Sequence, residues 1–231
     1  MSHEGFTAPH RTIGRAAAWG VFFLAVVYAV PLVLGLLSLK SPQDPIGDPY
    51  FSIMELLIFL TAPLMVVSMV AVHAYAPPEV KIYSLTALAF MILLAGITSS
   101  VHFVILTVSR QIDTGLPWVP LFLSFKWPSV PYILDILAWD VFFALAMLFA
   151  APVFKGGRLE TAVRFLMIAS GVISLAGLIG VPFGNMQIRN IGIVGYAVVA
   201  PVAFLLLGML FGRTQHVPGA TRRSFDSQSS A

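Results

Sequence analysis

The chain has 231 residues, of which 58% are hydrophobic and only 10% are charged. A soluble domain carries about 25% charged residues, so this composition excludes a soluble particle coated with charged side chains. The absence of cysteine from the sequence excludes disulfides, thiolate metal sites, cysteine nucleophiles and iron–sulfur ligation. The net charge of +3 gathers at the ends of apolar segments, which is typical of a membrane topology signal and not of a nucleic-acid-binding surface.

The sequence predicts an all-α, polytopic integral membrane protein, because its apolar segments are long enough to cross a bilayer as helices. Residues 1–13 are expected to form a cytoplasmic tail, 14–211 a six-helix transmembrane domain, and the Ser-rich segment 212–231 a disordered cytoplasmic tail. The six transmembrane helices are predicted over residues 14–37, 50–73, 82–109, 129–154, 161–182 and 191–211. The first is too long for a signal-peptide core, so we expect it to be retained.

Two connections stand out between these helices. Residues 38–49 contain several prolines and predict an external turn. Residues 110–128 form the longest connection, and it is apolar, with Trp118 and Trp127 flanking its most hydrophobic part. Tryptophan settles at membrane–water interfaces. We therefore expect an interfacial segment between the third and fourth helices, either a short helix or a plug over the bundle.

The distribution of Lys and Arg predicts the orientation. With both termini inside, nine of the 13 Lys and Arg residues fall in inside segments and four in outside segments. Positive charge prefers the cytoplasmic side. The sequence thus predicts an N-in/C-in, multi-pass protein of the cell (inner) membrane.

This orientation places the ionisable residues of the spans at similar depths. Counted from the outer span ends at about 1.5 Å per residue, Glu55 lies roughly 7 Å deep, Asp135 roughly 9 Å, His102 roughly 10 Å and Asp140 roughly 16 Å. An ionisable group inside a membrane is costly and normally has a partner or a task. The inner half is apolar apart from His73 and basic end residues. We therefore expect a bundle that is closed towards the cytoplasm and polar towards the outside.

These depths define a candidate ligand-binding pocket. Its predicted residues are Glu55, Ser99, His102, Asp135, Trp139, Asp140, Arg189, Asn190 and Tyr196. Asp135 and Asp140 are about 140° apart around an α-helix, so both cannot point to one centre. The sequence leaves open which of the two faces the pocket.

Several kinds of chemistry were weighed for these residues. Carboxylates with an imidazole suit a divalent metal, but the sequence has neither an H-x-x-x-H nor an E-x-x-H motif. A polar network is therefore the favoured interpretation, and no cofactor or metal is predicted, with a divalent metal as a lower-ranked alternative. Haem is disfavoured because His73 and His102 belong to opposite ends of the bundle. Retinal is excluded because no lysine lies in mid-span.

Two further alternatives concern single segments. Ser99 or Ser100 with His102 and Asp140 could form a hydrolase triad, which only geometry can establish. The turn over 183–190 could bind an anion at the start of the sixth helix with Arg189. In the structural alternative, Arg189 pairs instead with Glu55, Asp135 or a lipid phosphate.

The leading functional hypothesis is a protein that binds or transports a small solute, a proton or a lipid headgroup in an outward-facing ionisable pocket. A second is an intramembrane enzyme on a lipid or isoprenoid, with His102 and Asp140 as candidate catalytic residues. A third is an accessory subunit of a membrane complex. The expected partners are the bilayer, a small solute or lipid and, as alternatives, a second copy or a larger complex. No nucleic-acid partner is expected.

Overall fold

The computed structural model of the protein describes residues 6–41, 44–112 and 115–213. Across these residues the fold is all-helical, and six helical stretches are long and apolar enough to span a membrane. These stretches are Ala8–Leu37, Tyr50–Tyr75, Pro78–Arg110, Val130–Val153, Arg158–Gly180 and Met186–Arg213. The predicted all-α class and the six long apolar helices are thereby confirmed. The N-in/C-in orientation and the choice of the inner membrane stay predictions.

Most of the long stretches consist of several successive helical elements. The first half of the chain contains α1 (Ala8–Leu37), α2 (Tyr50–Tyr75), η1 (Pro78–Val80), α3 (Lys81–Leu106), η2 (Val108–Arg110) and α4 (Val119–Leu123). The fourth stretch contains α5 (Val130–Ile136), the π-helical turn η3 (Leu137–Phe143), α6 (Ala144–Ala150) and η4 (Ala151–Val153). The last two contain α7 (Arg158–Gly177), η5 (Leu178–Gly180), α8 (Met186–Ile193), the π-helical turn η6 (Val194–Val199) and α9 (Ala200–Arg213).

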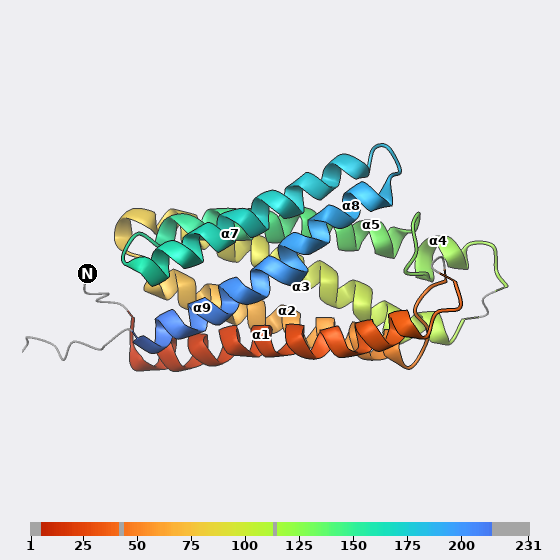
Figure 1. Cartoon of the computed structure of the whole chain (residues 1–231), viewed down its shortest axis with the longest axis horizontal. Helices are drawn as coiled ribbons and strands as arrows, with labels where there is room; N and C mark the ends of the chain where they lie inside the picture. The colour runs from red at the N-terminus through yellow and green to blue at the C-terminus, as the bar shows by residue number, and fades with distance from the viewer. Residues whose placement is uncertain (1–5, 42–43, 113–114, 214–231) are drawn as a thin grey trace, which may run out of the picture.

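The long helices form one elongated bundle (Figure 1). Helix α1 packs against α2 and α9, α3 against α2 and α6, and α7 against α6, α8 and α9. Helix α1 begins and α9 ends at the same end of the bundle, while α4 and the start of α5 lie at the opposite end. Residues early in α2, late in α3 and early in α5 therefore share the end that is remote from α1's start.

The N-terminal boundary of the bundle differs from the prediction. Helix α1 begins at Ala8 and not at Gly14, so the second half of the predicted 1–13 tail is helical. The backbone N–H of Thr7 donates to Nδ1 of His10 at 3.3 Å, which satisfies a donor next to the first turn. Phe6 is buried, with its ring centroid 5.4 Å from that of Tyr75. This segment thus packs on the bundle.

The other predicted non-span segments have different outcomes. In the connection predicted over 110–128, the structure contains the short helix α4, and whether it lies at a membrane interface stays a prediction. Helix α9 continues to Arg213, so the start of the predicted 212–231 tail is helical. The remainder of that tail, 214–231, lies outside the described residues.

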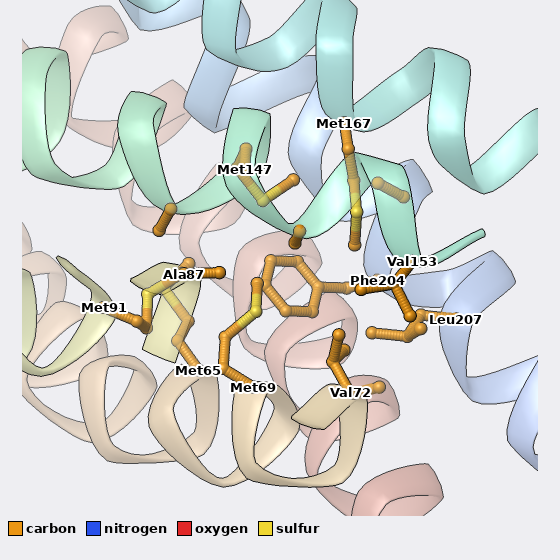
Figure 2. Close-up of a cluster of buried hydrophobic side chains, with 14 of the residues drawn as sticks. Met65, Met69, Val72, Ala87, Met91, Met147, Val153, Met167, Phe204 and Leu207 are labelled. Carbon is orange, nitrogen blue, oxygen red and sulfur yellow. The ribbon is translucent and has the colours of Figure 1, made fainter. Parts of the chain in front are cut away.

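A methionine-rich core fills the half of the bundle nearer to the start of α1. Figure 2 shows side chains from α2, α3, α6, α7 and α9 meeting around the ring of Phe204. Met69, Met91 and Met147 are fully buried, and Phe204 is 1% exposed. Unbranched, polarisable methionine fills irregular gaps well. This packing fills the interior at the end where α1 begins, and whether that end faces the cytoplasm stays a prediction.

Truncating the central ring of this core should destabilise the protein. We expect Phe204→Ala to lower the free energy of unfolding by about 3 to 5 kcal/mol, because it leaves a cavity among packed side chains. The matched control is Phe165→Ala on α7, whose side chain is 66% exposed. Thermal unfolding in detergent measures both. Equal losses of stability in the two variants would contradict this description of the core.

Candidate functional site

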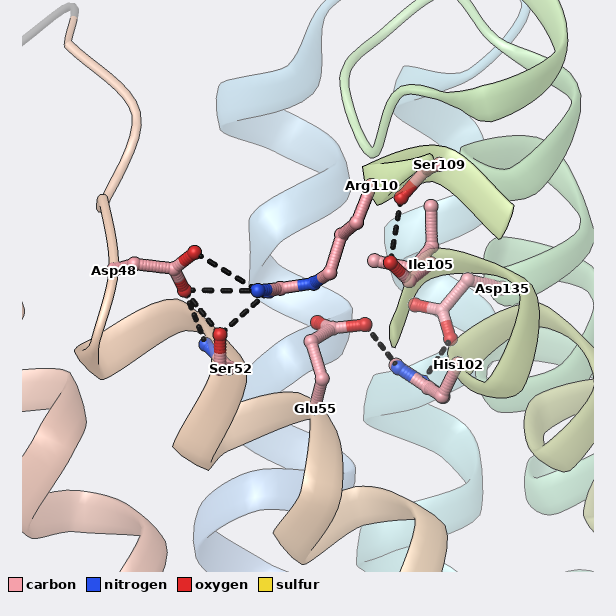
Figure 3. A network of polar contacts seen from close by, with 8 residues as sticks. All are labelled: Asp48, Ser52, Glu55, His102, Ile105, Ser109, Arg110 and Asp135. Carbon is pink, nitrogen blue, oxygen red and sulfur yellow. Dashed lines mark hydrogen bonds and ion pairs between the residues drawn. The ribbon is translucent and has the colours of Figure 1, made fainter. Parts of the chain in front are cut away.

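The imidazole of His102 lies between carboxylates that come from two other helices. Its Nδ1 is 2.6 Å from Oε2 of Glu55 on α2, and its Nε2 is 3.5 Å from Oδ1 of Asp135 on α5. The first contact is a hydrogen bond and the second a longer ion pair. Figure 3 shows both carboxylates directed at the ring of His102. We call these three residues the His102 centre.

The His102 centre is buried to different degrees. The side chain of His102 is fully buried, that of Glu55 is 3% exposed, and that of Asp135 is 15% exposed. Burying a polar or charged group without a partner costs several kcal/mol. Because α2, α3 and α5 each supply one member, the contacts also tie these helices together. Asp135 is the member nearest to the surface.

Asp140 and Arg189 form a second buried ion pair. Nη2 of Arg189 donates to Oδ2 of Asp140 at 2.8 Å, and the two side chains are 4% and 0% exposed. The structural alternative, in which Arg189 is paired, thus applies, but its partner is Asp140 and not Glu55 or Asp135. Asp140 lies deeper than Asp135 and on another face of the fourth span, and that face is the one directed at Arg189.

Two π-helical turns meet beside this pair. Asp140 and Trp139 lie in η3, and Tyr196 lies in η6. The ring centroids of Trp139 and Tyr196 are 5.2 Å apart. π-Helical turns are rare and frequent at functional sites. Each π-helical turn contains an extra residue and so changes the helical phase. Side chains after the turn therefore point in directions that differ from those in an unbroken α-helix.

Glycines bring α8 and η6 very close to Asp140 and α7. A Cβ built on Gly192 would overlap Oδ1 of Asp140, and one built on Gly195 would overlap Oγ of Ser174. Asp140 thus lies in a tight helix–helix contact. Of the two aspartates, Asp135 is the one that reaches His102, which answers the question that the sequence left open.

Aromatic rings cover both charged groups from the end where α4 lies. The ring centroid of Phe125 is 5.7 Å from that of His102 and 5.4 Å from that of Tyr132. Cζ of Arg189 is 5.6 Å from the centroid of Tyr132, a cation–π contact. Phe125 belongs to the connection that precedes α5, and whether this segment acts as a plug stays a prediction.

Among the described residues, the side chains of the other predicted pocket residues make no hydrogen bond, ion pair or ring contact with that of His102. Trp139 and Tyr196 pack on each other beside the Asp140–Arg189 pair. Ser99 is half-buried, and Asn190 is exposed. The structure places the charged residues in two adjacent groups, the His102 centre and the Asp140–Arg189 pair, and not in one pocket. Asp135 connects the two electrostatically, because its charge acts on both His102 and Arg189.

Some residues around the site had not been singled out from the sequence. Tyr28 of α1 lies within electrostatic range of Glu55 and Asp135, and Phe125 and Tyr132 cover the charges. A tyrosine or phenylalanine in an apolar span carries no signal that separates it from ordinary lipid-facing or core residues. Only the arrangement of the helices identifies these three.

Several buried polar atoms lack a hydrogen-bond partner among the described residues. They are Oγ1 of Thr98, Nε2 of His102, Oδ1 of Asp135, Oδ1 of Asp140, Oγ of Ser174 and Nε of Arg189. A buried polar atom without a hydrogen bond is rare in proteins and calls for an explanation. All six belong to or adjoin the two charged groups, so the unused donors and acceptors of the interior gather here.

Two of the alternative chemistries can be judged from the geometry. Oδ1 of Asn185 accepts from the N–H groups of Gln187 and Ile188, so this side chain caps the start of α8 and competes with an anion there. The described residues contain no group of three or more His, Asp or Glu side chains placed to hold a metal. In the His102 centre each ring nitrogen already faces a carboxylate.

A groove of about 540 Å³ runs along α3 and α5 beside the His102 centre. It is lined by Ile92, Leu93, Gly96, Ile97, Ser100, Val101, Val104, Phe122, Val130, Pro131 and Leu134. None of the predicted pocket residues lines it. The groove is mainly apolar, and it is separate from the charged groups.

Comparison with protein-family models, with curated proteins and with solved structures finds no match to this chain.

The tight contact at Asp140 gives a direct test of the glycine packing. Gly192→Ala should destabilise the protein by roughly 1 to 3 kcal/mol, because the added methyl group overlaps the carboxylate of Asp140. The matched control is Gly96→Ala on α3, where a Cβ meets nothing within 4 Å. Thermal unfolding of both variants makes the comparison, and a neutral Gly192→Ala would overturn the packing described here.

An exposed polar network lies above the His102 centre, at the start of α2 (Figure 3). Nη1 of Arg110 is 3.1 Å from Oδ2 of Asp48, Nη2 donates to Oγ of Ser52 at 2.5 Å, and Ser52 donates to Asp48. The hydrogen bond from Ser52, assisted by Arg110 and opposed by slight burial, holds the pKa of Asp48 below its usual value of 3.8. The network therefore favours the ionised carboxylate.

This lowered pKa predicts the sign of an acid effect on stability. The contribution of Asp48 is present above the unfolded-state pKa near 3.8 and is lost as pH falls through the lower folded-state value. Because the pair is exposed, we expect less than about 1 kcal/mol. Asp48→Asn should therefore lower stability slightly at neutral pH and not at pH below about 3. A pH series of unfolding temperatures measures this, and a larger effect in acid would contradict it.

Proposed function

We propose that this protein is a proton-binding membrane protein, in which the His102 centre exchanges a proton as part of binding or transporting a small solute. The observation that carries the proposal is the position of His102, a buried imidazole with one carboxylate at each ring nitrogen. Histidine is the side chain best suited to gain and lose a proton near neutral pH. Two acids on opposite nitrogens give that proton both a donor and an acceptor.

The geometry supports a specific transfer. A proton on Asp135 can pass to Nε2 of His102 across the 3.5 Å contact once the two atoms approach slightly. The proton on Nδ1 can then pass to Oε2 of Glu55 across the 2.6 Å hydrogen bond. One proton enters the ring and one leaves it, so the imidazole returns to a neutral state with its hydrogen on the other nitrogen. A ring flip or the reverse transfer restores the starting tautomer.

Exposure and packing support exchange from one side. Asp135 is the most exposed member of the His102 centre, so it is the natural point of entry. On the other side, the core around Met65, Met69 and Met91 closes the path along α2 and α3. In the predicted N-in/C-in orientation, exchange would take place with the outside of the cell membrane. A transport cycle would require this core to open.

The Asp140–Arg189 pair supports a second candidate function. A buried ion pair between two spans, packed closely against Gly192, can have the purely structural role of fixing the register of the two helices. That is what an accessory subunit of a larger membrane complex needs. In that case the His102 centre would also only hold helices together, and its protonation would not change with pH.

The test is potentiometric proton uptake by the purified protein between about pH 9 and pH 5. We expect His102→Gln to lose about one proton of uptake per chain relative to the wild type. Asp135→Asn should weaken proton binding and move the uptake to lower pH by about one unit, because it removes a neighbouring negative charge.

The matched control is Ser100→Ala on α3, which removes a hydroxyl group that bonds only the backbone of Gly96. Its proton uptake should equal that of the wild type. If His102→Gln folds and takes up as many protons as the wild type and Ser100→Ala, the proton-binding proposal fails, and the accessory-subunit function is favoured.

A further inference from the structure

A basic groove lies at the end of the bundle where α1 begins and α9 ends. It has a volume of about 610 Å³ and is lined by Arg11, Thr12, Arg15, Ala16 and Trp19 of α1 and by Gly212 of α9. Arg11 and Arg15 are four residues apart, so they share one face of α1. Among the residues that the structure describes, no carboxylate lines the groove. It is remote from the His102 centre and is not used by the proposed function.

Two glycines of α9 shape this groove. A Cβ on Gly208 would overlap the indole ring of Trp19, so only glycine lets that ring lie against α9. A Cβ on Gly212 would contact the side chain of Arg15 from Cδ to Nη1, at 3.6 to 3.7 Å. Cζ of Arg15 in turn lies 4.1 Å from the centroid of the Trp19 ring. The guanidinium is thus held in place by a cation–π contact.

The charge of Arg15 is not neutralised within the described part of the chain. The ion pairs there are formed by His102, Arg110 and Arg189, and none involves Arg15. Arg15 is exposed, and so is Thr12, which lies one turn earlier in α1. Arg213 follows Gly212 at the end of α9 and adds to the positive charge of this end. A guanidinium oriented by an aromatic ring and lacking a carboxylate partner is well suited to bind an anion in two-point fashion.

We propose that this groove binds the phosphodiester headgroup of an anionic membrane phospholipid. Arg15 would donate to the phosphate oxygens as a fork, Arg11 would add charge, and Thr12 would offer a hydroxyl donor. The groove lies on two membrane-spanning helices at their ends, where phospholipid headgroups sit. Trp19 is 37% exposed, as expected for an indole at the headgroup level. Charge complementarity and this position favour a lipid over a soluble anion.

The test uses the full chain in detergent, with lipid retention measured by native mass spectrometry. Phosphatidylglycerol should bind the wild type, and phosphatidylcholine should bind at least fivefold more weakly. Arg15→Gln should weaken phosphatidylglycerol binding about fivefold, as expected for one basic residue at a membrane surface. Arg15→Lys keeps the charge without the fork, so it should lie between the two.

The matched control is Arg164→Gln on α7, an exposed arginine outside the groove, and it should bind phosphatidylglycerol like the wild type. Equal weakening by Arg164→Gln and Arg15→Gln would overturn the site, and so would equal binding of the two lipids. Competition by inorganic phosphate at the same concentration as the lipid would show a soluble anion to be the ligand and would overturn the lipid assignment. Should Arg15→Gln fail to fold, Arg15→Lys with Arg164→Lys as its control decides the question.

Discussion

A histidine between two acids in an apolar bundle is the interaction on which this account depends. None of its members can be placed singly in a membrane interior without a cost of several kcal/mol. Held together by α2, α3 and α5, they pair through a hydrogen bond between His102 and Glu55 and a longer ion pair between His102 and Asp135. The same contacts that make the bundle stable therefore create a site where a proton can be stored, because histidine can exist with one or two ring protons.

The two charged groups differ in what they allow. The Asp140–Arg189 pair is locked by close glycine contacts and has no freedom to rearrange. The His102 centre is covered by an aromatic ring from a connection outside the spans, and one of its acids reaches the surface. Close packing of this kind fixes the first group, whereas the second is free to respond. The methionine-rich core lies in the half of the bundle nearer to the start of α1, away from the His102 centre.

The sequence could predict those features of the fold and of the site that are set by a single segment of the chain. The long apolar helices and the shared level of Glu55, His102 and Asp135 along them were predictable, because span length and residue position are properties of single segments. The partner of Arg189 was not, since it depends on which helices are neighbours and on π-helical turns that no local pattern marked. The contact of Phe125 with His102 could not be predicted either, because a connection has no helical phase from which to predict its contacts.

The most direct test is the protonation of the two ring nitrogens of His102, observed by ¹⁵N solid-state NMR of histidine-labelled protein in lipid. The signal is assigned by its disappearance in His102→Gln. The account predicts that Nδ1 is hydrogen-bonded and that the ring gains a second proton as pH is lowered from about 9 to 5. A single neutral tautomer whose spectrum does not change over that range would contradict it.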